Sequence, residues 1–355
     1  MKITKFNYME DVILIAEQFN IEEVINVCNY GHGRINETFL VETESSPGNS
    51  SNPRRYILQK LHKILTPDVL KDIEVITNFL ETKGFITPKL VSTKKGELGV
   101  LSGREIWRML TFIPGTTVDK ALNGDMVEDA ASLFGKFHSA LIDLNYEFLH
   151  KIPNFHNTKA IMDKLTSVSL RYKGTYKYNS LIPLTERVLM EYRGVDKSFQ
   201  RLPDRIIHGD PKMNNVRFDD NGSKAVSLLD LDTLGRNKII IDIGDAVRSW
   251  CSSSDDGGEF DLIIFERMMT GYMDNAFFMT KKERESIPNG VLLLILELTA
   301  RYITDAFIES YFNLDAERYS NLFEQNKDKA IFQMRLFDDF QGKRETVSQV
   351  IMRFS

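Results

Sequence analysis

The sequence predicts an α+β protein of two lobes, a small antiparallel-sheet lobe followed by a larger, mainly helical lobe. Short β-prone runs separated by turn residues fill the first part of the chain, and helical periodicity dominates the remainder. Pro114 and Gly115 interrupt the pattern where the two parts meet. We therefore expect one lobe at 1–113 and the other at 114–355.

The first lobe combines short strands with one well-defined helix. Residues 9–28 have helical spacing, whereas 24–41 is typical of two strands joined by a glycine turn. An amphipathic helix is expected at 68–83, with Pro67 before it and Gly84 at its end. Further strands are expected at 55–59, 89–92 and 106–112. Together these elements predict a small, strand-rich unit.

Helices dominate the second lobe. Helical periodicity is found at 125–142, 158–166, 182–193, 259–275 and 288–312. The segment 206–248 differs, because its short apolar runs are broken by acidic residues and asparagines, and a helix bearing Arg248 is expected at its end. Ligands commonly bind in the cleft between two such lobes, so we expect the functional site there.

Composition and charge exclude several classes of protein. Of 355 residues, 42% are hydrophobic and 27% are charged, as in ordinary globular proteins. A net charge of −5 gives no general attraction to nucleic acid or anionic lipid. The N-terminal segment lacks a long apolar stretch, and the apolar run at 291–296 is too short to cross a bilayer. We expect a cytoplasmic protein without nucleic-acid or membrane partners; nothing in the sequence indicates its oligomeric state.

The segment 206–216 and the apolar run after it carry the strongest chemical signal. The segment contains His208-Gly209-Asp210 and Asn215, and a turn and a β-prone run then lead to Asp230. Phosphoryl transfer needs a carboxylate that orients the attacking hydroxyl and oxygen ligands for Mg²⁺. In kinases with this pattern the first Asp is the catalytic base, and the Asn and the later Asp bind metal. Asp210, Asn215 and Asp230 occupy those places.

Other polar residues around this segment are assigned less specific roles. Lys212 follows Asp210 at the spacing that places a lysine on the γ-phosphate in protein kinases. His208 is expected to be a structural histidine that braces the loop rather than an acid or base. Asp242 and Asp245 are expected to cap a helix or brace a loop.

A glycine turn in the first lobe is a candidate for binding phosphates. Gly31 and Gly33 would let backbone N–H groups approach an anion closely. On the next strand, alternation directs Gln59 inward and Lys60 to the opposite face, and Glu74 lies on the following helix. Kinases usually pair a lysine with a glutamate at these places, so a Gln59–Glu74 pair carries less positive charge.

These residues resemble the aminoglycoside phosphotransferase and choline kinase superfamily, and within it most closely the N-acetylhexosamine 1-kinases. The resemblance covers nearly the whole chain. The matching stretches are GHGRINETFLV at 31–41, RYILQKL at 55–61, TPDVLKDIEVIT at 66–77, WRMLTFIPG at 107–115, HGDPKMNN at 208–215 and LLDLDT at 228–233. That subgroup itself carries a glutamine in its YILQ strand, as this chain does at Gln59.

The resemblance implies a bilobal protein-kinase-like fold with ATP between the lobes. Its adenine would be held by the backbone of a hinge formed by Thr111, Phe112 and Ile113. Mg²⁺ would be bound by Asn215 and Asp230, with Asp210 as the base.

The resemblance also implies a substrate-binding region in both lobes. Arg301 and Tyr311 match sugar-contacting positions of the hexosamine kinases. Arg34 stands where the subgroup often has a histidine near the sugar. The implied acceptor is a small molecule, an amino sugar.

The expected reaction is transfer of the ATP γ-phosphoryl group to the anomeric hydroxyl of an N-acetylhexosamine. A second reading keeps the fold but takes choline, an amino alcohol or an aminoglycoside as acceptor. Such a cation needs an acidic or aromatic cage, to which Asp255, Asp256 and Glu259 could contribute and which Arg34 and Arg301 would disfavour. A third reading is a nucleotide-binding module without catalysis, which only Gln59 supports.

Overall fold

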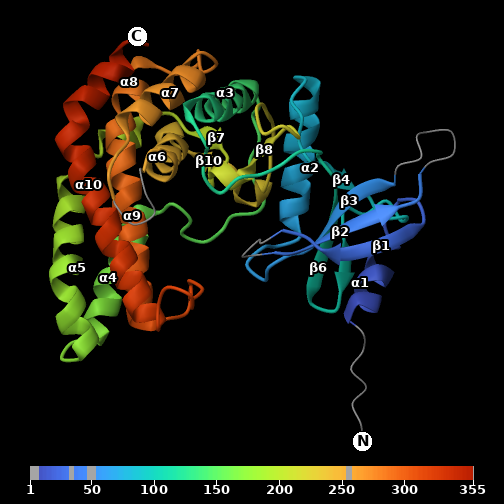
Figure 1. Ribbon diagram of the computed structural model, residues 1–355, viewed down its shortest axis with the longest axis horizontal. Coiled ribbons are helices and arrows are strands. Elements are labelled where there is room, and N and C mark those ends of the chain that lie inside the picture. Colours follow the sequence, from blue (N-terminus) through green and yellow to red (C-terminus); the bar gives the residue numbers. More distant parts are fainter. Residues whose placement is uncertain (1–7, 32–35, 46–52, 253–257, 355) are drawn as a thin grey trace, which may run out of the picture.

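The computed structural model describes residues 8–31, 36–45, 53–252 and 258–354. It places an antiparallel sheet beside a larger helical part, with one helix, α2, standing between them (Figure 1). This is the α+β architecture that the sequence predicts. Within the described residues, no helix is both long and apolar enough to pass through a lipid bilayer.

The sheet is antiparallel, and its strands follow the order β1-β2-β3-β6-β4, with β5 paired to β6. Its strands are β1 (Val24–Asn29), β2 (Glu37–Thr43), β3 (Arg54–Lys60), β4 (Leu90–Val91), β5 (Val100–Ser102) and β6 (Glu105–Thr111). Gln59 of β3 pairs in register with Arg108 of β6, so the two side chains share one face of the sheet. The pairing therefore places the cation of Arg108 next to Gln59, at the position where kinases usually carry a lysine.

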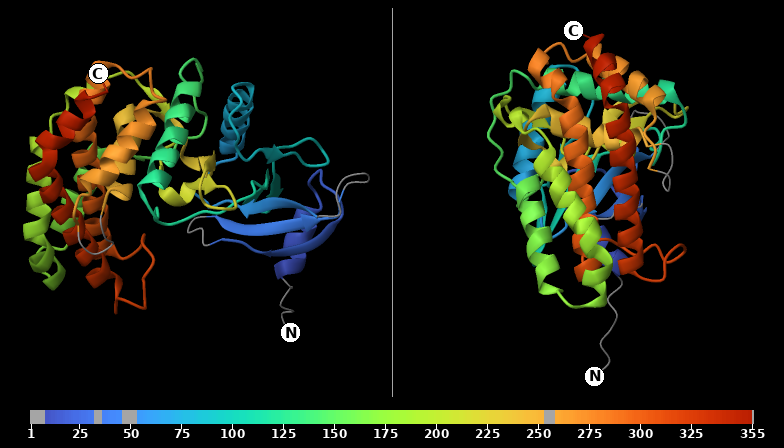
Figure 2. Two further views of the ribbon diagram at one scale, coloured as in Figure 1. Left: turned by 45° about the horizontal axis from the view of Figure 1, so that its top comes forward. Right: turned by 90° about the vertical axis from the view of Figure 1, so that its left-hand side faces the viewer.

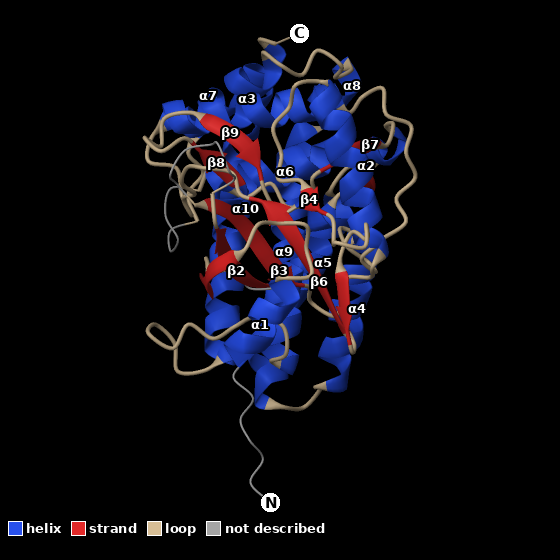
Figure 3. Ribbon diagram, turned by 90° about the vertical axis from the view of Figure 1, so that its right-hand side faces the viewer, coloured by secondary structure: helices blue, strands red, loops and turns tan. Residues whose placement is uncertain are grey.

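The helix α1 (Tyr8–Ala16) covers the other face of the sheet (Figure 3). Its apolar side chains form a small core with Phe39, Leu58, Trp107 and Met109, all of them buried. Lys60 lies on this same face, at the end of the central strand β3, and forms ion pairs with Glu37 and Glu105 of the neighbouring strands, which confirms that it points away from Gln59. The helical interpretation of 9–28 is wrong beyond residue 16, because the chain turns there to start β1.

The helix α2 (Asp68–Thr82) matches the expected helix at 68–83 and ends before Gly84, which has a positive φ of 73°. Its buried side chains, among them Ile73, Ile76 and Leu80, join the large core of the helical part rather than the small core under α1. Packing therefore ties α2 to the second part, although it precedes the predicted boundary. The division at residue 113 stays a prediction.

The helical part contains the expected helices and two that the sequence did not predict. Its helices are α3 (Gly124–Ala140), α4 (Thr158–Arg171), α5 (Tyr176–Gly194), α6 (Ile239–Trp250), α7 (Leu262–Met273), α8 (Lys281–Glu285), α9 (Ile287–Ile308) and α10 (Leu322–Met352). The two unpredicted helices are the short α8 and the long α10, of which α10 packs along α9 (Figure 2). Asn321 begins α10, because its side chain accepts the Glu324 N–H at 2.9 Å.

The segment between the helices forms two short antiparallel pairs that face the sheet. These are β7 (Arg205–Ile207) with β10 (Gly235–Asn237), and β8 (Val216–Phe218) with β9 (Ala225–Leu228). Residue 115 must be glycine because its φ is +118° and a Cβ would lie 1.8 Å from the Phe218 carbonyl oxygen. The connection between the two parts therefore runs directly against the β8–β9 hairpin.

Candidate active site

The loop at 208–215, here called the catalytic loop, is fixed by hydrogen bonds from both sides. Asp242 of α6 accepts the backbone N–H groups of His208 and Gly209 at 2.6 and 2.8 Å. His208 is fully buried, and its Nε2 donates to the Leu229 carbonyl at 2.9 Å. Burial lowers the pKa of His208, so the ring acts as a neutral brace. The expected structural roles of His208 and Asp242 agree with these contacts.

Gly209 allows the catalytic loop to touch the turn at 230–233, here called the metal turn. Its φ is +83°, and a Cβ at this position would lie 2.4 Å from the Thr233 carbonyl oxygen. The Thr233 hydroxyl donates to the His208 carbonyl at 2.8 Å. The two segments are therefore in direct contact, although they are separated by the β8–β9 hairpin in the sequence.

Asp210 lies beside both of its expected partners on the catalytic loop. Lys212 Nζ is 2.7 Å from Asp210 Oδ1. Asn215 Nδ2 donates to the Asp210 carbonyl at 2.8 Å and to Oδ2 at 3.2 Å. Because the amide nitrogen of Asn215 faces Asp210, its oxygen is the atom left to bind a cation.

Asp230 begins the metal turn in a left-handed conformation, with φ of 54°. Burial, together with the nearby carboxylates of Asp232 and Asp210, raises the pKa of Asp230 to about 7. A divalent cation would relieve this crowding of negative charge. Asp210 and Asn215 are therefore in hydrogen-bond contact, and Asp230 lies near enough to Asp210 for their charges to interact; joint binding of one metal by Asn215 and Asp230 stays a prediction.

The residues present fit a magnesium site of the kind found in kinases. Within the described part of the chain, no group of three or more His, Cys, Asp or Glu side chains forms a metal cage. Mg²⁺ in phosphate-transferring sites is held by one or two protein carboxylates, with phosphate oxygens and water completing the shell. Asp230 would supply one carboxylate, and Asn215 would add an amide oxygen.

The sheet contributes a buried cation to this site through Arg108, which is 2% exposed. Its Nε and Nη2 donate to Gln59 Oε1 at 2.9 and 2.8 Å, and its guanidinium forms a two-point ion pair with Asp232 of the metal turn. Asn36 Nδ2 donates to the same Asp232 carboxylate at 2.8 Å. Gln59 therefore has partners other than the expected Glu74, with which it forms no hydrogen bond among the described residues.

The segment expected to be a hinge follows β6 and is held by two arginines. Thr111 is the last residue of β6. Arg55 and Arg217 lie over the Phe112 ring, 4.2 and 5.2 Å from its centroid. Arg217 Nε also donates to the Ile113 carbonyl at 2.8 Å, so that carbonyl already has a partner. The Thr111 N–H likewise donates to the Lys89 carbonyl at 2.8 Å, and contact of this segment with an adenine stays a prediction.

The glycine turn is described only in part. Gly31 has a left-handed backbone with φ of 71° and open space around its Cα, as a close approach to a ligand requires. Gly33 and Arg34 lie outside the described residues, so their expected contacts with phosphate and acceptor stay predictions. Asn36, where the described chain resumes, ties the end of this turn to the metal turn through Asp232.

Comparison with known proteins agrees with this geometry. Residues 26–266, more than half of the chain, match the phosphotransferase enzyme family. The chain belongs to this family. The superfamily resemblance is thereby confirmed, whereas the hexosamine 1-kinase subgroup is not tested.

Solved structures share the fold of this phosphotransferase at low sequence identity. An aminoglycoside phosphotransferase from Alicyclobacillus acidocaldarius is 14% identical with a TM-score of 0.66, covering 95% of this chain and 96% of that one. An amicoumacin kinase in complex with AMP-PNP, Ca²⁺ and Ami is 15% identical with a TM-score of 0.64, covering 93% of each chain. A choline kinase from Cryptosporidium parvum is 14% identical with a TM-score of 0.60, covering 97% and 98%.

The phosphotransferase carries its predicted sugar-contacting pair, here called the acceptor edge, near the end of α9. Arg301 Nη2 donates to the Tyr311 hydroxyl at 2.7 Å, and its guanidinium lies 5.1 Å from the ring centroid. Asp305 accepts the Tyr311 N–H at 2.8 Å, yet Tyr311 remains 62% exposed. The structure thus brings Arg301 and Tyr311 together, and their contact with a sugar stays a prediction.

A histidine that the sequence interpretation did not single out braces the catalytic loop of the phosphotransferase from the far side. His156 lies 2.9 Å from Glu297 Oε1 and 2.8 Å from the Gly209 carbonyl oxygen. Burial disfavours its cation, but the hydrogen bond to Glu297 and the charges of Glu297 and Asp245 raise the pKa of His156 to about 9. A charged His156 therefore joins α9 to the residue before Asp210.

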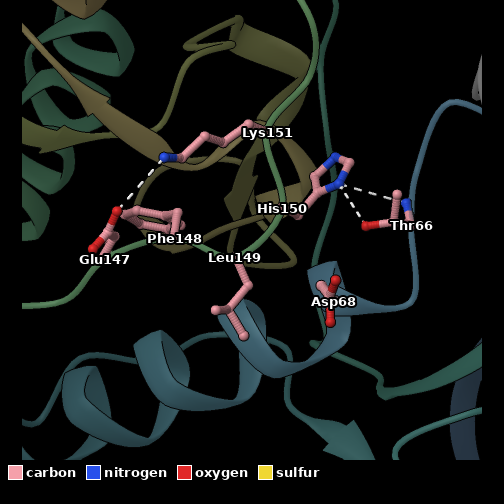
Figure 4. A pocket seen from close by; sticks show the side chains of 7 residues that line it. All are labelled: Thr66, Asp68, Glu147, Phe148, Leu149, His150 and Lys151. Atoms are coloured by element: carbon pink, nitrogen blue, oxygen red, sulfur yellow. Dashed lines mark hydrogen bonds and ion pairs between the residues drawn. The ribbon is translucent and has the colours of Figure 1, made fainter.

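A polar hollow of about 470 Å³ lies where α2 begins, beside the loop at 147–151 (Figure 4). His150 Nδ1 faces Thr66, whose hydroxyl is 3.0 Å away. Asp72 of α2 accepts the backbone N–H groups of Leu149 and His150 at 3.0 and 2.8 Å. These contacts fasten α2 to the loop between α3 and α4. None of the predicted site residues that the structure describes lines this hollow.

Arg108, Asp232 and His156 are the site residues that sequence reasoning missed. Arg108 and Asp232 both lie within stretches that carry the family resemblance, at 107–115 and 228–233. Alternation along β6 could have placed Arg108 on the same face as Gln59. No local pattern marks His156, because both of its partners come from distant parts of the sequence.

Proposed function

We propose that this phosphotransferase transfers the γ-phosphoryl group of ATP to the anomeric hydroxyl of an N-acetylhexosamine, which gives the sugar 1-phosphate. Two observations support the proposal: the contact of Asp210 with Asn215, and the electrostatic interaction of Asp210 with Asp230. Phosphoryl transfer needs a carboxylate at the hydroxyl and oxygen ligands for the metal at the phosphates, which these three residues would supply. The amicoumacin kinase complex, which contains AMP-PNP and Ca²⁺, supports a nucleotide triphosphate with a divalent cation. We propose Mg²⁺ because two protein oxygens plus phosphates suit it.

In the proposed reaction, the acceptor oxygen bonds to the γ-phosphorus while the bond from that phosphorus to the bridging oxygen of ADP breaks. The hydroxyl proton passes to Asp210. Lys212, which lies against Asp210, would contact the transferred group. A divalent cation held by Asn215 and Asp230 would neutralise charge on the phosphates. An anomeric hydroxyl is more acidic than an ordinary alcohol, so a carboxylate base suffices.

Two arginines, Arg248 and Arg301, support a neutral sugar over a cationic acceptor, although Arg248 is paired with Asp245. Burial lowers the pKa of the Arg248 guanidinium, but the nearby carboxylates of Asp245 and Asp210 raise it overall. Arg301 adds a second cation at the acceptor edge. An acceptor such as choline or an aminoglycoside would bring positive charge toward these groups. Asp255 and Asp256, which could form an acidic cage, lie outside the described residues.

A panel of acceptors tests the proposal. Purified protein with ATP and Mg²⁺ should release ADP with N-acetylglucosamine or N-acetylgalactosamine, and much more slowly with choline, ethanolamine or kanamycin. The methyl glycosides of the two sugars, whose anomeric oxygen is blocked, should be inert. Turnover of a methyl glycoside, or preference for a cation, would contradict the sugar 1-kinase. ATP binding without transfer to any acceptor would favour a module without catalysis.

A further inference from the structure

The Arg108–Asp232 ion pair links the cleft face of the sheet to the metal turn, and it is enclosed on both sides. The side chains of Arg108 and Asp232 are 2% and 7% exposed. Gln59 Oε1 accepts from two nitrogens of the guanidinium, and Asp232 accepts from two as well. An arginine has five N–H donors, so these two partners occupy most of them.

We propose that the Arg108–Asp232 pair positions Asp230, and so orders the metal turn for Mg²⁺ and ATP from β6. This inference rests on the proposed function, because it assigns the pair a role toward Mg²⁺ and ATP. Arg108 acts through Asp232 and is a positioning residue. It is not a direct ligand of the phosphates.

The short metal turn explains how the Arg108–Asp232 pair would position Asp230. Asp230 and Asp232 are separated by one residue. Asp230 directly precedes a short 3-10 helix (Leu231–Thr233), and Asp232 lies within it. Fixing the Asp232 carboxylate therefore restrains the backbone of Asp230. Two residues from the sheet side hold that carboxylate, since Asn36 Nδ2 donates to Oδ2 at 2.8 Å and Arg108 Nη2 donates to it at 3.0 Å.

The same contacts explain why residue 59 is a glutamine. A lysine at this position would place a second cation against the guanidinium of Arg108, its neighbour in register. The glutamine instead offers a carbonyl oxygen to Arg108 and donates through Nε2 to the Thr38 hydroxyl at 3.1 Å. The presence of glutamine rather than lysine at position 59 is thus explained by the buried Arg108 beside it.

The test is the dependence of ATP affinity on Mg²⁺, measured by calorimetry without an acceptor. The double variant Arg108→Gln/Asp232→Asn removes both charges and keeps the local net charge unchanged. Dissociation constants for ATP are measured in EDTA and in excess Mg²⁺. We expect the gain in affinity from Mg²⁺ to fall by about 10- to 100-fold, as for other residues that orient metal ligands, while affinity in EDTA stays within about threefold.

A second buried pair provides the matched control. Arg205 Nε lies 3.0 Å from Glu283 Oε1, and the Glu283 side chain is fully buried. Among the described residues, neither side chain forms a hydrogen bond with the metal turn. Arg205→Gln/Glu283→Gln should lower the melting temperature without changing the Mg²⁺ gain. Arg108→Lys, which keeps the charge, should recover part of the gain and serves if the double variant fails to fold.

Two outcomes would overturn the inference. A parallel loss of affinity in EDTA and in Mg²⁺ would mean that Arg108 contacts the nucleotide itself. An unchanged Mg²⁺ gain in a folded Arg108 variant would mean that the pair only stabilises the protein. A wild-type protein that binds no ATP under either condition would instead contradict the proposed function, so the two failures can be told apart.

Discussion

The catalytic loop and the acceptor edge differ in how firmly the fold holds them. Hydrogen bonds from Asp242, Thr233 and His156 reach the backbone of the catalytic loop, and the groups involved are largely buried. The acceptor edge consists of an arginine and a tyrosine that hold each other, and Tyr311 is mostly exposed. The catalytic loop is therefore fixed by the core of the protein. The proposed acceptor contacts would instead come from side chains that substitution can alter at little cost in stability.

The largest effect is expected at the chemical centre of the catalytic loop. Asp210→Asn keeps the shape of the side chain but removes the base, so kcat should fall by about 10²- to 10⁴-fold. ATP affinity should be nearly unchanged, since Asp210 is assigned to the acceptor hydroxyl. Steady-state kinetics and calorimetry measure the two quantities. Undiminished turnover would remove Asp210 from the mechanism.

The stability that His156 contributes by bracing the catalytic loop should depend on pH. The pKa of His156 is raised to about 9 in the folded protein from an ordinary value of 6.5. Its charge therefore contributes up to about 3 kcal/mol below pH ~6.5, and this contribution is lost as pH rises through ~9. Urea unfolding from pH 6 to pH 10 should show this decline in the wild-type protein.

His156→Gln is the variant that isolates this contribution. Glutamine can still hydrogen-bond to Glu297 or to the Gly209 carbonyl, but it cannot carry a charge. The variant should be less stable near pH 6, and its stability should decline less between pH 6.5 and pH 9. An identical pH profile for the two proteins would show that His156 does not titrate as the structure indicates.

Close packing between the catalytic loop and the metal turn is the next target. Gly209→Ala places a methyl group 2.4 Å from a backbone oxygen at a φ of +83°, so it should reduce the free energy of unfolding by about 1–3 kcal/mol. Turnover should fall as well, since the two segments would separate. Gly194→Ala is the control: it has open space, ends α5, and should change stability by less than about 1 kcal/mol. Equal effects of the two variants would contradict the contact.

The smallest effect is expected at the acceptor edge. Tyr311→Phe removes one hydroxyl, worth about 0.5–1.5 kcal/mol in a hydrogen bond, so KM for the sugar should rise by roughly three- to tenfold. Thermal stability and KM for ATP should stay close to wild type because the ring is exposed. Exposed Tyr176 offers a matched Tyr→Phe control outside the acceptor edge. A KM for the sugar that does not change would remove Tyr311 from the acceptor site.

The catalytic loop could be predicted from sequence because its residues follow one another at fixed spacing. Asp210, Lys212 and Asn215 lie within a single short stretch, and the hairpin that brings Asp230 back is also visible in the sequence. Alternation along β3 likewise predicted the opposite directions of Gln59 and Lys60, which the structure confirms. Site residues that lie close together in the chain could therefore be predicted from the sequence.

The remaining features depend on contacts between distant segments. The Arg108–Asp232 pair joins residues far apart in the chain, so neither residue alone indicates the other. The first helix was predicted too long because apolar spacing continues past Ala16, where tertiary contacts take over: Phe19 is buried and Asn20 N–H donates to the Ser92 carbonyl at 2.9 Å. Such pairings override local periodicity.

The backbone of Asp230 has a practical consequence for engineering. A non-glycine residue in the left-handed region costs about 1 kcal/mol or more, and here the residue is also an acid whose pKa the carboxylates of Asp232 and Asp210 help to raise. Replacing Asp230 with glycine would remove both the backbone strain and the crowding of carboxylates, and we expect it to abolish turnover as well. A screen that ranks variants only by thermal stability would therefore favour inactive proteins, so each round of selection also needs an assay of product formation.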